Sequence, residues 1–179
     1  MRNLTRTIAA IGIGGLLLVG CGRQESPPVP PSRQAPQPPR GVLPLSPADY
    51  VATASSIDLF VIQASQVALA QGRGARLREA ATAMAADHGG TSGQLSFAGR
   101  RLNLLPSATM MPRHQAMLDE LRSAGDFDMA FKRLMIGVHE QGIRIHGDFA
   151  VAGSSPTLRP VAELAFPAMR RHLEMLRGL

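Results

Sequence analysis

The chain has 179 residues, one cysteine, no tryptophan and a formal net charge of +6 at pH 7. A single cysteine excludes an internal disulfide and a metal cluster held by several thiolates. The positive charge comes from arginines spread along the chain, with neither a basic tract nor interleaved aromatic residues, so the composition argues against nucleic acid as a partner.

Residues 1–20 are typical of a bacterial lipoprotein signal peptide. Two arginines precede an uncharged apolar run, residues 8–20, which is too short to be a membrane-spanning helix. The run ends in the letters LVGC, which resemble the lipobox, where the cysteine is acylated and the signal is cut before it. We therefore predict that Cys21 is lipidated and becomes the first residue of the mature protein, anchored by its acyl chains.

Gly22 follows the cysteine, where an inner-membrane retention signal has Asp. By resemblance to lipoproteins of double-membraned bacteria, this favours the outer membrane, with the domain facing the periplasm. The membrane is then one partner, through the lipid, and an envelope protein or the cell wall is a second expected partner.

Residues 21–46 combine the lipidated cysteine with a proline-rich segment, which has no acidic residue from position 27 onward. Such a composition cannot bury a core, and prolines favour extended backbone. We expect this segment to be a tether between the membrane and the domain.

Residues 47–179 are predicted to form one helical domain. Ser46 followed by Pro47 is typical of a helix start, and apolar residues then recur at helical spacing. The expected helices cover residues 47–71, 75–102, 114–123, 127–152, and a last segment capped by residues 154–156. Roughly 25 residues separate the second and third long helices, so we predict an all-α, ferritin-like four-helix bundle with a crossover connection containing a short helix.

The spacing also indicates which positions face the core, and two histidines are among them. The expected inward positions are Tyr50, Ala54, Ile57, Val61, Ala64 and Ala68 in the first helix, Leu77, Ala81, Met84, His88, Thr91, Leu95, Ala98 and Leu102 in the second, and Val161, Ala165, Ala168, His172 and Met175 in the last. The methionines fall where filling gaps in the core is a sufficient explanation.

Three short motifs carry a resemblance to a known family. They are the step from Met84 to Asp87-His88, the Phe127-Asp128 opening followed by Phe131 and His139, and the closing Pro167 with His172-Leu173. In this order and spacing, the chain resembles the bacterial envelope family called domain of unknown function 4142, over residues 48–179. The resemblance implies a ferritin-like bundle and an exported, often membrane-anchored protein, with no established activity.

The residues argue against di-iron chemistry. A ferritin-like di-iron site needs Glu three residues before its histidines, and here Ala85, Ile136 and Met169 occupy those positions. Asp58 lies off the main apolar stripe of the first helix. Nothing places a nucleophile beside a His–Asp pair, and no phosphate-binding glycine loop is present. We expect no enzyme activity and no cofactor.

A mononuclear site is harder to dismiss. His88, His139 and His172 come from three helices, and three imidazoles with an open position suit zinc or copper. His139 lies one step off the apolar seam of its helix, so convergence is open. The favoured interpretation is that the rings are buried, neutral and hydrogen-bonded, with Asp87 as a neighbour of His88 or a partner for another helix. His114 and His146 are expected on the solvent side.

Three glycines follow His88 within the predicted second helix. Gly89, Gly90 and Gly93 each disfavour a helix by roughly 1 kcal/mol relative to Ala. Close approach of a neighbouring helix or a local kink is the favoured explanation, with space for a ligand or a helix break as alternatives. Together, the residues predict a periplasmic bundle with a structural, interaction or stress-related role; the alternative is a metal- or small-ligand-binding bundle.

Overall fold

The computed structural model describes residues 45–179. The predictions for the signal peptide (1–20), for Cys21 and for the tether up to residue 44 lie outside these residues. Among the described residues every regular element is an α-helix.

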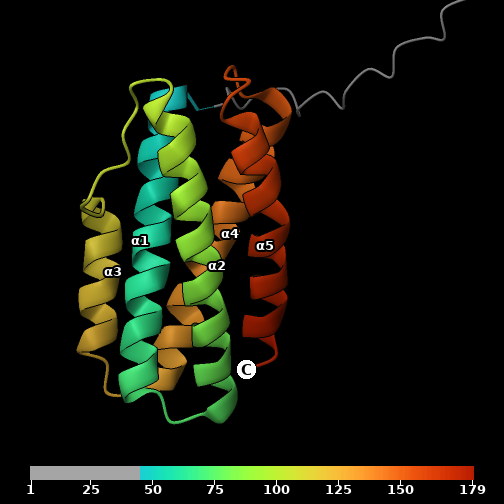
Figure 1. Cartoon of the computed structure of the whole chain (residues 1–179). Coiled ribbons are helices and arrows are strands. Elements are labelled where there is room, and N and C mark those ends of the chain that lie inside the picture. The colour runs from blue at the N-terminus through green and yellow to red at the C-terminus, as the bar shows by residue number, and fades with distance from the viewer. Residues whose placement is uncertain (1–44) are drawn as a thin grey trace, which may run out of the picture. The chain divides into compact units, whose positions relative to one another are not determined.

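Four long helices form the bundle, and a fifth, short helix lies in the crossover (Figure 1). The helices are α1 (Pro47–Gln71), α2 (Ala75–Arg100), α3 (Pro112–Arg122), α4 (Phe127–Ala152) and α5 (Arg159–Arg177). α1 packs most extensively on α2, and α4 on α5, while α3 lies against α1 and α4 from outside. The expected all-α bundle with a crossover containing a short helix is confirmed.

Side-chain capping explains the start of α1, whereas the last helix starts later than predicted. The Ser46 hydroxyl accepts the backbone N–H of Asp49 at 3.1 Å, which satisfies a free donor at the start of α1. The predicted cap of the last helix at residues 154–156 is wrong, because α5 begins at Arg159. Ser155 instead closes a preceding turn, in which its carbonyl accepts the N–H groups of Leu158 and Arg159.

The core consists of two apolar clusters, one toward each end of the bundle. The larger contains Phe60, Met84 and Phe131, and the smaller contains Tyr50 and Phe149. Every inward position predicted for α1 is buried. α1 is long and apolar enough to cross a membrane. In the structure 67% of its most apolar stretch is buried inside the bundle, as expected for a core helix.

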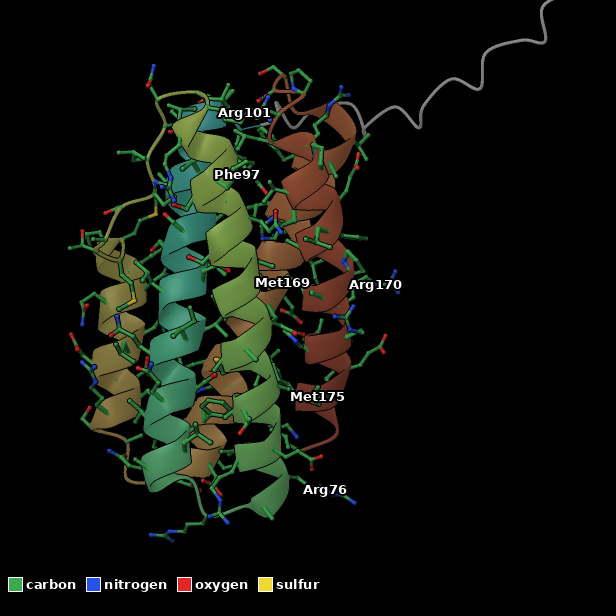
Figure 2. The ribbon with its side chains drawn as sticks, viewed as in Figure 1. Arg76, Phe97, Arg101, Met169, Arg170 and Met175 are labelled. Atoms are coloured by element: carbon green, nitrogen blue, oxygen red, sulfur yellow. The ribbon has the colours of Figure 1, made fainter. Side chains whose placement is uncertain are left out.

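Three predicted core positions differ in the structure, and the first of them, Thr91 of α2, is half-buried. Leu102 lies beyond the end of α2 and is half-buried, and Met175 in the last turns of α5 is 38% exposed. Figure 2 shows Met175 near the end of α5, with Met169 further into the bundle and the arginines, such as Arg170, on its outside. Leu176, the next residue, is 0% exposed, so the end of α5 is covered and Met175 lies off its buried face.

The glycines of α2 are not explained by close packing. α2 is continuous from Ala75 to Arg100, so the helix-break alternative is wrong. A Cβ added at Gly89, Gly90 or Gly93 would meet no atom within 4 Å, so the close-approach explanation is also wrong. All three residues are exposed and leave space beside the helix.

Candidate metal centre

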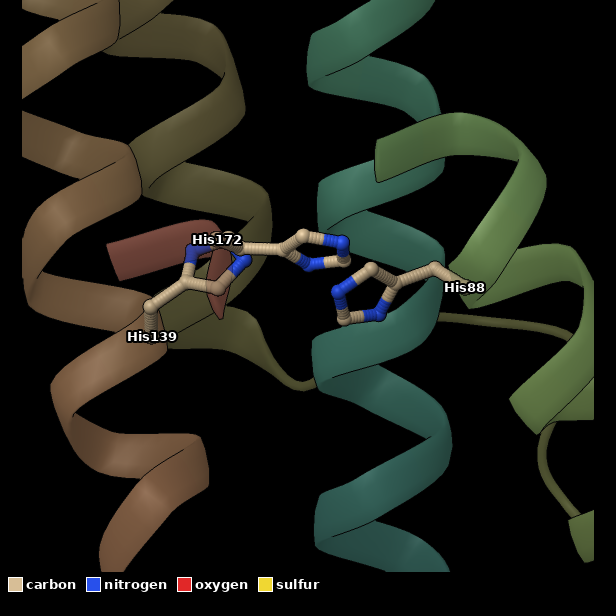
Figure 3. A group of neighbouring side chains, drawn as sticks. All are labelled: His88, His139 and His172. Carbon is tan, nitrogen blue, oxygen red and sulfur yellow. The ribbon is translucent and has the colours of Figure 1, made fainter. Parts of the chain in front are cut away.

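His88, His139 and His172 converge in the core, from α2, α4 and α5 (Figure 3). One ring nitrogen of each lies within 4.8 Å of the other two, and the ring centroids are 5.4 to 5.5 Å apart. The rings are 2%, 0% and 1% exposed, respectively. The convergence that the sequence left open is therefore present in the fold.

Each of the three rings uses one nitrogen to bind an acceptor outside the cluster. Nδ1 of His88 lies 2.8 Å from Oδ1 of Asp58, and Nδ1 of His139 lies 2.7 Å from the carbonyl oxygen of Met135. Nε2 of His172 lies 2.9 Å from Oδ2 of Asp87. A backbone carbonyl can only accept, so Nδ1 of His139 carries its ring proton. Nδ1 of His88 and Nε2 of His172 carry theirs when Asp58 and Asp87 are ionised, because an ionised carboxylate also only accepts.

The remaining nitrogens therefore carry lone pairs. Nε2 of His139 and Nδ1 of His172 are buried with no hydrogen-bond partner among residues 45–179. With Nδ1 of His88 bound to Asp58, Nε2 is its free nitrogen. Unpartnered polar atoms in a core are costly, and three lone pairs that face one another favour a cation between them.

The three rings and their hydrogen-bond partners resemble a metal site in which outer residues orient the ligands. Metal-bound histidines typically donate their other N–H to a carboxylate or a backbone carbonyl, which fixes the ring and its tautomer. Asp58 and Asp87 supply the carboxylates here, and Met135 supplies the carbonyl. Nitrogens around a zinc or copper ion stand about 3.4 Å apart when each bond is about 2.0–2.1 Å.

Burial keeps the ligand rings neutral. Burial, together with the neighbouring imidazoles, lowers the pKa of His88 and of His139 to about 3. Burial also lowers the pKa of His172, against the opposing effect of its hydrogen bond to Asp87. Neutral imidazole is the form that binds a metal, so near pH 7 no proton has to leave a ring nitrogen.

Asp58 is buried beside His88 and was missed as a core residue. Its side chain is 4% exposed, and Oδ1 also accepts the Thr91 hydroxyl at 3.1 Å. Burial raises the pKa of Asp58 to about 7, while His146 and Thr91 lower it. One sequence signal could have found it: Asp58 is the only charged residue of α1 after the first turn.

Asp87 binds another helix rather than its neighbour His88. Its Oδ2 accepts from His172 of α5 and lies 3.5 Å from the guanidinium of Arg171. The side chain of Asp87 is 46% exposed, so it joins the buried rings to the surface. Of the two roles that the sequence allowed, the structure has the partner for another helix.

The expectation that His114 and His146 face solvent is wrong. His114 is 0% exposed, because α3 covers α1 and brings its ring against Ser56, with Nδ1 2.6 Å from the hydroxyl oxygen. His146 is 3% exposed, and its Nδ1 lies 3.0 Å from the Tyr50 hydroxyl. Burial lowers the pKa of His146 to about 4.

Two solved proteins share the fold at low sequence identity. CopM in the Cu(II)-bound form is 15% identical, with a TM-score of 0.65, over 76% of this chain and 96% of CopM. A DUF305 fragment from Deinococcus radiodurans is 16% identical, with a TM-score of 0.63, over 76% of this chain and 97% of the fragment. At such identities the likeness shows a common helical-bundle fold alone.

Sequence comparison supplies the family. No curated protein matches the chain in sequence. The family model described as "Domain of unknown function (DUF4142)" matches residues 31–179, which include all five helices and the three converging histidines. The chain therefore belongs to the DUF4142 family.

Proposed function

We propose that this protein binds one copper ion through His88, His139 and His172. The observation that carries the proposal is the set of three buried rings whose N–H groups all point outward to acceptors, while their other nitrogens lie within 4.8 Å of one another. A metal ion satisfies all three lone pairs at once.

The alternative of rings that hydrogen-bond to one another fits this geometry poorly. A ring pair can bond only if one ring turns an N–H toward the lone pair of the next. Here the N–H groups of His139 and His172 are engaged with Met135 and Asp87, and their second nitrogens remain unpartnered. Rotating either ring to serve its neighbour would break its present hydrogen bond, to Met135 for His139 or to Asp87 for His172.

Copper is favoured by the ligand chemistry. Imidazole suits both zinc and copper, and divalent copper binds a nitrogen site more tightly than the other first-row divalent metals. The three nitrogens come without a thiolate or a carboxylate at the centre, which suits copper in either oxidation state. CopM, which shares this fold, is known in Cu(II)-bound and Cu(I)-bound forms.

The proposal includes a non-catalytic role and a place in the cell. The ligand rings are at most 2% exposed, which leaves a bound ion shielded from a substrate and suits storage or protection against metal stress. We place the bundle in the periplasm, held at the outer membrane by acyl chains on Cys21. Replacing Cys21→Ser tests the anchor: labelling with radioactive palmitate should disappear, and continued labelling would disprove it.

Metal titration of the purified protein tests the site. The chain has one tyrosine and no tryptophan, and Tyr50 lies about two helical turns from Asp58 on α1, so Tyr50 fluorescence reports locally on a bound copper ion. We expect one Cu²⁺ per chain, with nitrogen couplings in the electron paramagnetic resonance spectrum.

Variants separate the ligands from other buried histidines. His88→Ala, His139→Ala and His172→Ala should each lose stoichiometric copper, whereas His114→Gln, the matched control, should keep it. Circular dichroism checks that each variant is folded. Retention of one copper ion by all three ligand variants contradicts the site, and a wild-type protein that takes up zinc but not copper contradicts the choice of metal.

A further inference from the structure

A metal centre with rings at most 2% exposed needs a route from solvent. The following inference rests on the proposed copper site and concerns how the ion reaches it. Three ring contacts lead away from the centre: to Asp58 on α1, to Met135 on α4 and to Asp87 on α2. Asp58 is buried and Met135 contributes a carbonyl inside α4, whereas Asp87 is 46% exposed.

A surface groove lies at this point, between α2 and α5. Its volume is about 330 Å³, and its lining includes Asp87, Gly90 and Thr91 of α2, and Pro167, Ala168 and Arg171 of α5. These positions bracket the ligands in the sequence, since Asp87 directly precedes His88 and Arg171 directly precedes His172. The groove therefore runs beside the metal centre on the seam between the two helices.

Two lining residues connect the groove to the ligands. Oδ2 of Asp87 accepts from His172, and the hydroxyl of Thr91 donates to Asp58, whose carboxylate holds His88. A cation that binds the exposed carboxylate of Asp87 is thus one side chain away from His172. Breaking a single hydrogen bond, between Asp87 and His172, frees that ring to move toward the ion.

Gly90 keeps this groove open. A Cβ at Gly90 would meet no atom within 4 Å, so a side chain there would project into the groove without disturbing the core. Glycine in a helix interior is unfavourable by about 1 kcal/mol relative to Ala, and tight packing does not account for it here. Access for an ion does account for the glycine at this position.

We propose that the groove between α2 and α5 is the entrance for the copper ion, with Asp87 as the carboxylate that captures the ion and Gly90 as the residue that leaves the path clear. Arg171, which lies 3.5 Å from Asp87 and is 62% exposed, places a positive charge at the same mouth. This charge competes with an arriving cation for the carboxylate of Asp87.

The rate of copper uptake tests the entrance. Stopped-flow mixing of the purified protein with Cu²⁺ follows the quenching of Tyr50 fluorescence, and equilibrium titration gives the affinity. Gly90→Leu should slow uptake about tenfold and slow release equally, which leaves the dissociation constant unchanged because the site itself is intact. Gly93→Leu is the matched control: it is equally exposed, its Cβ meets nothing, and it lies outside the groove lining.

A second variant makes an opposite prediction. Arg171→Gln removes the positive charge at the mouth and should accelerate uptake, with the difference shrinking at high salt because screening weakens the charge. Equal uptake rates in wild type, Gly90→Leu and Gly93→Leu overturn the entrance while the copper site stands. A wild-type protein that binds no copper at equilibrium overturns the proposed function, and the entrance with it.

Discussion

The region around His114 and the three-histidine centre are both buried, and they are built differently; a fifth buried histidine, His146, lies beside Tyr50 outside both. His114, between α3 and α1, has a partner for each nitrogen: Nδ1 lies 2.6 Å from the Ser56 hydroxyl oxygen and Nε2 lies 3.2 Å from Oε1 of Gln141. Ser56 also accepts the N–H of Met111 at 2.7 Å, so this network is satisfied within itself. In the three-histidine centre, each ring has one engaged nitrogen and one that faces the other rings.

Burial therefore does not distinguish a structural histidine from a ligand. His114 and His139 are both 0% exposed, yet only His139 has a nitrogen left without a partner. A buried polar atom without a partner is destabilising, so the protein retains it where a ligand can compensate. The two regions differ in the number of satisfied nitrogens. Nε2 of His146 is also buried without a partner, so what marks the centre is that its unpartnered nitrogens belong to rings that converge.

The largest change in stability is expected on acidification, because protons bind to several buried histidine rings together. The folded-state pKa values of His88 and His139 are about 3 and that of His146 is about 4, below the unfolded value of about 6.5. The unfolded chain binds more protons below pH 6.5, so the free energy of unfolding falls as the pH drops toward 4.

Asp58 opposes this trend, since its raised pKa of about 7 lets the folded state take up a proton first, but it is one group against three. Urea denaturation of the metal-free protein between pH 7.5 and 4.5 measures the net effect. His139→Gln should reduce the loss, whereas His114→Gln should reduce it less. Stability that increases on acidification would contradict the assignment of the buried rings as neutral.

Copper binding should stabilise the folded protein through the three-histidine centre and not through His114. At a free copper concentration 100 times the dissociation constant, ligand binding adds about 2.7 kcal/mol to the free energy of unfolding. For a domain of this size that raises the melting temperature by roughly 10 °C. The rise should vanish in His139→Ala and persist in His114→Gln, as measured by thermal circular dichroism, and an equal rise in both variants would place the ion elsewhere.

The supporting residues of the two regions should also differ. Asp58→Asn replaces a carboxylate that orients His88, and loss of such a group weakens metal affinity by about 10–100-fold. Gln141→Ala removes a partner of His114 and should leave copper affinity unchanged. Competitive titration against a chelator measures both, and unchanged affinity in Asp58→Asn would show that His88 needs no orienting partner.

The smallest effect is expected at α3. His114→Ala removes the histidine partner of the Ser56 hydroxyl and of the Gln141 amide oxygen, which should lower stability by about 1–3 kcal/mol. Copper stoichiometry should stay at one per chain. Chemical denaturation measures the stability of His114→Ala, and copper titration measures its stoichiometry. A loss of copper in this variant would contradict the distinction between the His114 region and the three-histidine centre.

Much of the fold could be predicted from local patterns. α1 and α4 have the expected limits, and every inward position predicted for α1 is buried, although further residues such as Ser56 and Asp58 are buried as well. The cap at residues 154–156 failed because a polar residue before a proline can close a turn as well as start a helix. Asp58, His114 and His146 were misplaced because their burial depends on a facing helix and not on their own.

The sequence by itself determined the helices, the faces that pack, the absence of the glutamates of a di-iron site, and the family, because these depend on residues close together in the chain. Only the tertiary structure decided that His88, His139 and His172 meet, that their free nitrogens face inward, and that Asp87 binds α5. Those properties depend on the rotation of each helix about its axis and on the ring tautomers. The partners of His88 and His172 lie 30 and 85 residues away, and only the partner of His139, Met135, is local.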